Sequence, residues 1–292
     1  MAESILLWGA DFIVTLQQFT WWPWEGLMRF VSGLGGMGYL FMVPLVLWGV
    51  DRRLGVSLVL LLALTMYLNT VVKEWFELAR PYMTDSRILS EGEIGYSFPS
   101  GHAQLVVVFW GLLALWVGKR WFTGLCLMLM FLTGLSRSYL GVHYPSDVVV
   151  GWLLGGLTLW AWQHWAGVRQ GGILEHCSLS QRAVALFVVT AVLLAVAVLL
   201  GSTAMVYGSL GMGLAAGLSA LVVADAPHML SVARRALRCG LGLAVMFATL
   251  ALLSKIAGWS SLPAAVDSFM LTGLFAVVIT ALLPWLFQRV RL

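Results

Sequence analysis

The sequence predicts an all-α, polytopic membrane protein, and three features of its composition point to this class. Of its 292 residues, 61% are hydrophobic and only 10% are charged, whereas soluble domains carry roughly 25% charged residues. The mean hydropathy is +0.92, and there are 15 tryptophans, a residue that gathers at membrane interfaces. Apolar runs of roughly 20 residues, enough to cross a hydrocarbon core about 30 Å thick, recur along the chain. The expected fold is therefore a bundle of transmembrane helices.

The first element is an amphipathic helix over residues 3–19 that lies in the membrane interface. Glu3 and Asp11 stand among Ile, Leu, Trp and Phe at helical spacing, which is unusual for a membrane span. Tryptophans 21, 22 and 24 follow and indicate the headgroup level. We therefore treat residues 1–24 as an interfacial N-terminal segment.

Nine transmembrane helices are expected after this segment. They divide into a core of five helices over 25–168 and a C-terminal extension of four helices over 169–292. The nine ranges are 28–50, 54–74, 102–118, 121–141, 147–166, 183–202, 204–225, 236–256 and 265–287.

The distribution of Lys and Arg predicts the orientation of the helices. If the Asp51-Arg52-Arg53 turn is cytoplasmic, that side holds 11 of the 17 basic residues, as the positive-inside rule requires. The N-terminus is then extracytoplasmic and the C-terminus cytoplasmic. Short loops favour a bacterial plasma (inner) membrane. The net charge of +4 reflects this topology and an anion site, so nothing indicates a nucleic-acid partner.

Three polar clusters stand out in this apolar chain, and all three fall on the extracytoplasmic side. They are Lys73-x6-Arg80-Pro81, Pro99-Ser100-Gly101-His102 and Ser136-Arg137-x5-His143-x3-Asp147. Charged residues in membrane segments are costly and usually functional. Fixed cations, helix N-terminal donors and two imidazoles are the groups that phosphoryl transfer without a metal requires.

The cations suit a phosphate group. Lys73 supplies a point charge, and Arg80 and Arg137 supply planar forks for bidentate contacts. We expect Lys73 and Arg80 to share one helix that Pro81 ends. The Ser100 and Gly101 N–H groups should lie at a helix N-terminus, where an anion is favoured. Two roles remain open for Ser136: it either helps to shape the phosphate-binding cradle formed by these cations and N–H groups, or it only packs beside Arg137.

These clusters resemble the signatures of the type 2 phosphatidic acid phosphatase superfamily, K-x6-RP, PSGH and SR-x5-H-x3-D, and the resemblance covers about residues 28–166. It implies a hydrolase in which His143 is the nucleophile and forms a phosphohistidine, Asp147 orients it, and His102 is the acid for the leaving group. It implies no metal and no cofactor. We interpret Asp85, Glu91 and Glu93 as a solvated loop.

Substrate and partners follow less directly from the sequence. A site at the membrane surface under a short loop favours a lipid phosphate partner: phosphatidate, phosphatidylglycerophosphate, a sphingoid-base phosphate or a polyprenyl mono- or diphosphate. The run from Glu93 to His102 and the nine-span topology are also similar to the glucose-6-phosphatase branch, so a soluble sugar phosphate is the alternative.

A lipid transporter or scramblase is the alternative from another class. Its support is the C-terminal part, 183–288, which has four spans without a catalytic motif. Gly213-x3-Gly217 has a spacing that permits close helix approach, and no charge stands clearly at mid-membrane. We therefore expect these helices to serve packing or homodimer formation.

Overall fold

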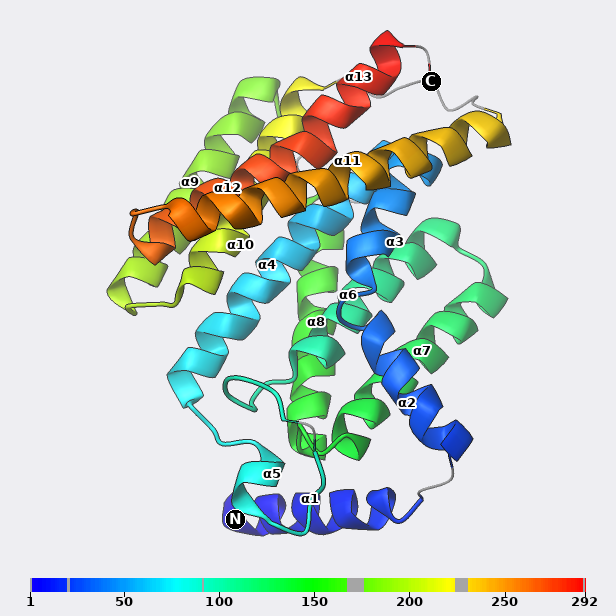
Figure 1. Cartoon of the computed structure of the whole chain (residues 1–292), viewed down its shortest axis with the longest axis vertical. Helices are drawn as coiled ribbons and strands as arrows, with labels where there is room; N and C mark the ends of the chain where they lie inside the picture. The colour runs from blue at the N-terminus through cyan, green and yellow to red at the C-terminus, as the bar shows by residue number, and fades with distance from the viewer. Residues whose placement is uncertain (1, 20–21, 91, 167–175, 224–230, 291) are drawn as a thin grey trace. The chain divides into compact units, whose positions relative to one another are not determined.

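The computed structural model describes residues 2–19, 22–90, 92–166, 176–223, 231–290 and 292, and every regular element in these ranges is a helix (Figure 1). The all-α prediction is confirmed for this part of the chain. Contacts group the chain into two compact units, 1–39 with 68–163 and 40–67 with 164–292. The predictions for Trp21 and Glu91 fall outside the described residues.

Six stretches of the described chain have the length and hydropathy of a membrane span. Helices α2 (Trp22–Leu34) and α3 (Tyr39–Leu45), the latter continued by the π-helical segment η1 (Val46–Val50), pass together but are bent by 54°, and make a seventh if counted as one span. Two of the nine expected spans are not in this set. Helix α6 (Gly101–Val117) has only 17 residues, and α8 (Pro145–Trp165) carries Asp147, His164 and several Gly and Trp. The expectation of nine therefore exceeds what length and hydropathy support.

Lys73 and Arg80 do not share a helix, contrary to the expectation from the Pro81 position. Helix α4 (Arg52–Phe76) ends three residues after Lys73, and Glu77 has a left-handed φ of 49° that interrupts the helix. Arg80 is the extended N-cap residue of α5 (Pro81–Thr84), where proline occupies the first turn. Pro81 starts a helix here because the N–H groups of a first turn have no acceptor within the helix, so proline loses no hydrogen bond in that position.

The first unit contains α1 (Ala2–Gln17), α2, the end of α4, α5, α6, α7 (Arg120–Tyr139) and α8. Two glycines let α8 approach α6 closely. A Cβ at Gly151 would stand 2.6 Å from the carbonyl oxygen of Ser100, and one at Gly155 would stand 2.7 Å from that of Gln104. Backbone contact at this distance brings the start of α8 beside the start of α6.

Helix α1 packs on the end of this unit that carries the polar motifs. Ala10 and Ile13 are buried with Ile88 and Tyr144, while the opposite face exposes Trp8. One face of α1 is thus buried against the rest of the unit and the other is exposed.

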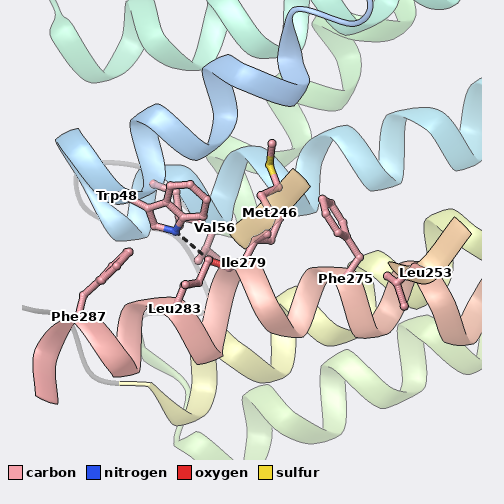
Figure 2. Packing of buried hydrophobic residues seen from close by; sticks show 9 residues of the cluster. Trp48, Val56, Met246, Leu253, Phe275, Ile279, Leu283 and Phe287 are labelled. Atoms are coloured by element: carbon pink, nitrogen blue, oxygen red, sulfur yellow. Dashed lines mark hydrogen bonds between the residues drawn. The ribbon is translucent and has the colours of Figure 1, made fainter. Parts of the chain in front are cut away.

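The second unit contains α3, η1, the first part of α4, α9 (Leu179–Leu199), α10 (Ala204–Val222), α11 (Val232–Trp259), α12 (Ala264–Val277), η3 (Val278–Leu282) and α13 (Leu283–Arg289). Figure 2 shows its core, in which Trp48 packs among Met246, Ile279 and Phe287. The indole N–H donates to the carbonyl of Ile279 at 3.1 Å. Lipid is as apolar as these side chains, so the cluster is stabilised mainly by close packing and such hydrogen bonds.

The glycines of α10 serve packing within this unit. A Cβ at Gly211 would stand only 2.1 Å from the carbonyl oxygen of Phe269 on α12, and one at Gly217 would stand 2.6 Å from Leu186 on α9. Thr272 donates a 2.6 Å hydrogen bond to the carbonyl of Gly208. The small-residue face of α10 is thus occupied by two neighbouring helices of its own unit.

Candidate active site

The three polar clusters lie in the first unit, on elements that meet around the 85–100 loop. Lys73 is in the last turn of α4, Arg80 precedes α5, and Ser100 caps α6, whose first residues are Gly101 and His102. Ser136 and Arg137 are in the last turn of α7, His143 lies in the short connection to α8, and Asp147 is in the first turn of α8.

Two arginines converge on one anionic group. Arg80 Nη1 donates to Glu93 Oε2 at 2.7 Å, and Arg137 Nη2 donates to both carboxylate oxygens of Glu93, at 2.8 and 2.7 Å. Both guanidinium groups are nearly buried, with side chains 4% and 5% exposed. Burial of Glu93 alone raises the pKa of its carboxyl, but the charges of Arg137 and Arg80 outweigh this and lower the pKa. Glu93 is therefore ionised at neutral pH.

The imidazole of His143 faces this same anion position. Its Nε2 lies 3.4 Å from Arg80 Nη1 and 3.9 Å from Glu93 Oε2. A guanidinium can only donate, so Nε2 must present its lone pair, and the proton of the neutral ring belongs on Nδ1. Burial, with added repulsion from Lys73 and Arg137, lowers the pKa of His143 well below its usual value. The ring thus stays neutral, with a nucleophilic nitrogen directed at the anion position.

Asp147 stands behind the ring. Its Oδ2 lies 3.6 Å from Nδ1 of His143, beyond hydrogen-bond distance, and accepts instead from the hydroxyl of Ser97 at 2.5 Å and from the N–H of Tyr144 at 3.0 Å. The carboxylate is 2% exposed. At this distance it can stabilise positive charge that develops on the imidazole during attack.

His102 packs against the turn between α2 and α3. An added Cβ at Gly36 would stand 2.5 Å from Nε2 of His102, so the turn backbone lies directly against the ring. The imidazole also interacts electrostatically with Arg137 and Glu93. Gly36 leaves the space in which this ring is held.

Gly36→Ala is expected to displace the His102 ring, because the new methyl group would occupy the position beside Nε2. A shift of about 1 Å in a catalytic group can cost on the order of 10²-fold in rate. If His102 is the acid that the sequence resemblance implies, kcat for phosphate release should fall by about that factor, with KM little changed. Gly33→Ala is the matched control, because no atom lies within 4 Å of a Cβ built there. Equal kcat in the two variants would contradict this packing role.

The remaining motif residues are held by other groups. Lys73 donates to the carbonyls of Tyr96 and Ser97, at 2.6 and 3.0 Å, and so fixes the loop before α6. The N–H of Ser100 donates to the carbonyl of Asp147 at 3.0 Å, and its hydroxyl caps α6. Ser136 donates to the carbonyl of Thr133.

The site also contains residues that the sequence analysis did not assign to it. Glu93 occupies the cradle, contrary to its interpretation as a solvated loop residue. Ser32 of α2 accepts from Arg137 Nη1 at 2.5 Å and is 5% exposed. Asn69 donates to the carbonyl of Pro99 and to Gln104, and its side chain lies 3.1 Å from a Cβ built at Gly101. Asn69 carried a usable signal, because it is a polar residue in an apolar run one turn before Lys73.

A cavity of about 480 Å³ opens onto the cradle. Its lining includes Glu93 and Arg137, with Gln17, Glu25 and Arg29 as further polar groups, and Leu89, Leu140 and Val142 as apolar ones. Within the described residues, no group of three or more His, Cys, Asp or Glu could hold a metal ion. The positive charge near His143 is supplied by Lys73, Arg80 and Arg137.

Comparisons with known proteins bear on the same segment. Residues 54–170 match the family model of the PAP2 superfamily. An undecaprenyl-diphosphatase of Sulfolobus acidocaldarius is 34% identical over 135 residues, which is 45% of this chain and 65% of that protein. A phosphatidylglycerophosphatase B of Bacillus subtilis is 33% identical over 110 residues, 35% of this chain and 52% of that protein. The match thus spans less than two thirds of either relative.

The crystal structure of Aquifex aeolicus LpxE matches with a TM-score of 0.48 and 23% identity, over 52% of this chain and 92% of that one. The matched segment contains all three polar clusters, and Arg80, Arg137 and His143 from it lie at the anion position described above. Residues 54–170 of this chain are therefore similar to the PAP2 superfamily.

Proposed function

We propose that the protein is a membrane lipid phosphatase that works without a metal through a phosphohistidine. The observation that supports this most is the anion position itself. A carboxylate sits between two buried arginines, 3.9 Å from the lone-pair nitrogen of His143. A phosphate group of the substrate would take that place, with its charge on Arg80 and Arg137.

The reaction would then proceed in two steps. Nε2 of His143 attacks phosphorus, so that an N–P bond forms while the P–O bond to the leaving alkoxide breaks. His102 donates a proton to that oxygen. His102 then removes a proton from water, which attacks the phosphohistidine and breaks the N–P bond, releasing inorganic phosphate. Asp147 stabilises the positive charge on His143 in both steps.

A lipid phosphate is the substrate class we favour. The two relatives are described as acting on undecaprenyl diphosphate and phosphatidylglycerophosphate, and the chain has six or seven candidate spans. We propose further that α6 and α8 also cross the bilayer, which gives nine spans. Residues 1–24, 25–168 and 169–292 are then separate functional parts. The N-terminus and the site face the extracytoplasmic side of a bacterial plasma membrane.

A soluble sugar phosphate is the second candidate, because Gln17, Glu25, Arg29 and Ser90 give part of the cavity a polar lining. These side chains could hydrogen-bond hydroxyl groups of a sugar.

Phosphate release from purified protein tests the function. We expect release from phosphatidylglycerophosphate or undecaprenyl diphosphate with kcat/KM at least tenfold above that for a hexose phosphate, and no loss of activity in EDTA, because fixed cations supply the charge that a metal would supply. A faster hexose phosphate reaction would favour the sugar-phosphate alternative. Loss of activity in EDTA with recovery on adding Mg²⁺ would contradict the metal-free mechanism.

A further inference from the structure

Glu93 is an internal anion at the centre of the cationic cradle. Its two oxygens accept three hydrogen bonds from Arg80 and Arg137, all between 2.7 and 2.8 Å. Charge-assisted bonds of this length are among the strongest in proteins. A substrate phosphate that binds both arginines must therefore displace this carboxylate.

The backbone around Glu93 is anchored independently of its side chain. The hydroxyl of Tyr82 donates to the carbonyl of Glu93 at 2.9 Å and accepts from its N–H at 3.2 Å. Arg80 donates to the carbonyls of Ile94 and Gly95 as well. Gly92 and Gly95 flank the segment with φ values of 82° and 86°, which glycine adopts readily. The carboxylate can therefore leave by rotation of its side chain while the loop stays in place.

Room for that rotation exists. The Glu93 side chain is 33% exposed and lines the cavity of about 480 Å³. The arginine side chains, in contrast, are 4% and 5% exposed and are held by further bonds, from Arg80 to the carbonyl of Val142 and from Arg137 to Ser32. When an anion binds, Glu93 moves and the arginines stay.

The charges decide which anions can displace Glu93. The carboxylate carries one negative charge, whereas a terminal phosphate carries close to two near neutral pH. A phosphodiester also carries only one negative charge, so replacing Glu93 with it gains no charge at the arginines. Its binding also costs the entropy that a free ligand loses when it is immobilised. A doubly charged phosphate gains extra Coulomb energy from both buried arginines.

We propose that Glu93 is a specificity-determining residue: it holds Arg80 and Arg137 in the resting enzyme and gives way to terminal phosphate groups with two negative charges but not to phosphodiesters. This role of Glu93 rests on the proposed function. It explains why the phosphodiesters of the surrounding membrane do not occupy the anion position of the enzyme. The discrimination is thermodynamic, because the diester must displace a resident anion of equal charge and the terminal phosphate has a charge advantage.

Direct binding of two small anions at pH 8 tests this proposal without turnover. Inorganic phosphate is the doubly charged probe and dimethyl phosphate is the singly charged one. In Glu93→Gln, which keeps the size of the side chain but removes its charge, we expect inorganic phosphate to bind about tenfold more tightly than to the wild type. Dimethyl phosphate should change from undetectable to measurable binding, and KM for the lipid substrate should fall more than kcat.

Two further variants serve as controls. Asp85→Asn removes one charge from the same loop, where Asp85 pairs with the exposed Arg87, and should bind both anions as the wild type does. Glu93→Asp keeps the charge and should keep the discrimination, which decides the matter if Glu93→Gln does not fold.

The proposal is overturned if dimethyl phosphate binds the wild type as tightly as inorganic phosphate does, or if Glu93→Gln leaves both affinities within twofold while kcat collapses. The latter result would make Glu93 a group that only positions the arginines. These affinities are measured without a lipid, so they decide the role of Glu93 even if no lipid phosphate is hydrolysed and the proposed function fails.

Discussion

His143→Ala is expected to reduce phosphate release by at least about 10⁴-fold, the scale of loss when a catalytic nucleophile is removed. Nε2 of His143 is the nitrogen that presents a lone pair to the anion position, 3.9 Å from the Glu93 carboxylate. Arg80 and Arg137 remain in place, so inorganic phosphate should still bind within a fewfold of its wild-type affinity. The measurement is therefore kcat for lipid phosphate hydrolysis beside a separate phosphate Kd.

A covalent intermediate distinguishes a nucleophile from a residue that only shapes the site. Wild-type protein quenched during turnover should carry an acid-labile phosphoenzyme, and His143→Ala should carry none. His164→Ala is the matched control, because this histidine is exposed near the end of α8 and makes an edge-to-face contact with Trp165. If His143→Ala turned over at the wild-type rate, His143 would not be the nucleophile. The lowered pKa of His143 also predicts that its ring stays neutral below the ordinary pKa of histidine, so a loss of activity just below that pH should come from another group.

Most of the long helices could be predicted from the sequence because they are apolar runs of bilayer length. The expected range 54–74 is close to α4, which covers Arg52–Phe76, and 265–287 is close to the continuous run from Ala264 to Arg289. Breaks within the runs could not be predicted in the same way. The bend after Leu34 and the left-handed Glu77 depend on local backbone geometry that leaves no mark on hydropathy.

The motif residues could be singled out because they are polar groups at fixed spacings in an apolar chain. Their partners could not, because no spacing connects them. Ser32 reaches Arg137 from a helix 105 positions earlier in the chain. Glu93 lies in a loop with Gly92, Gly95 and Tyr96, a composition typical of a solvated turn. Only the path of that loop, fixed by Tyr82 and Arg80, brings its carboxylate to the two arginines.

Arg137→Lys is expected to lower kcat/KM by about 10³-fold, the lower end of what a transition-state arginine contributes to phosphoryl transfer. The guanidinium fork uses Nη1 for Ser32 and Nη2 for the anion position, and an ammonium is a single point that cannot bridge both. The charge is conserved, so the loss measures geometry rather than electrostatics.

Arg87→Lys is the control for Arg137→Lys, because Arg87 also forks between two carboxylates, Asp11 and Asp85, but is 55% exposed and outside the cradle. It should keep wild-type kcat/KM within about twofold, as expected for an exposed ion pair. If Arg137→Lys kept more than a tenth of the wild-type value, charge alone would suffice at this position. The hydrogen bond to Ser32 would then be structural, and the two-arginine clamp would reduce to one oriented arginine, Arg80, and one movable cation.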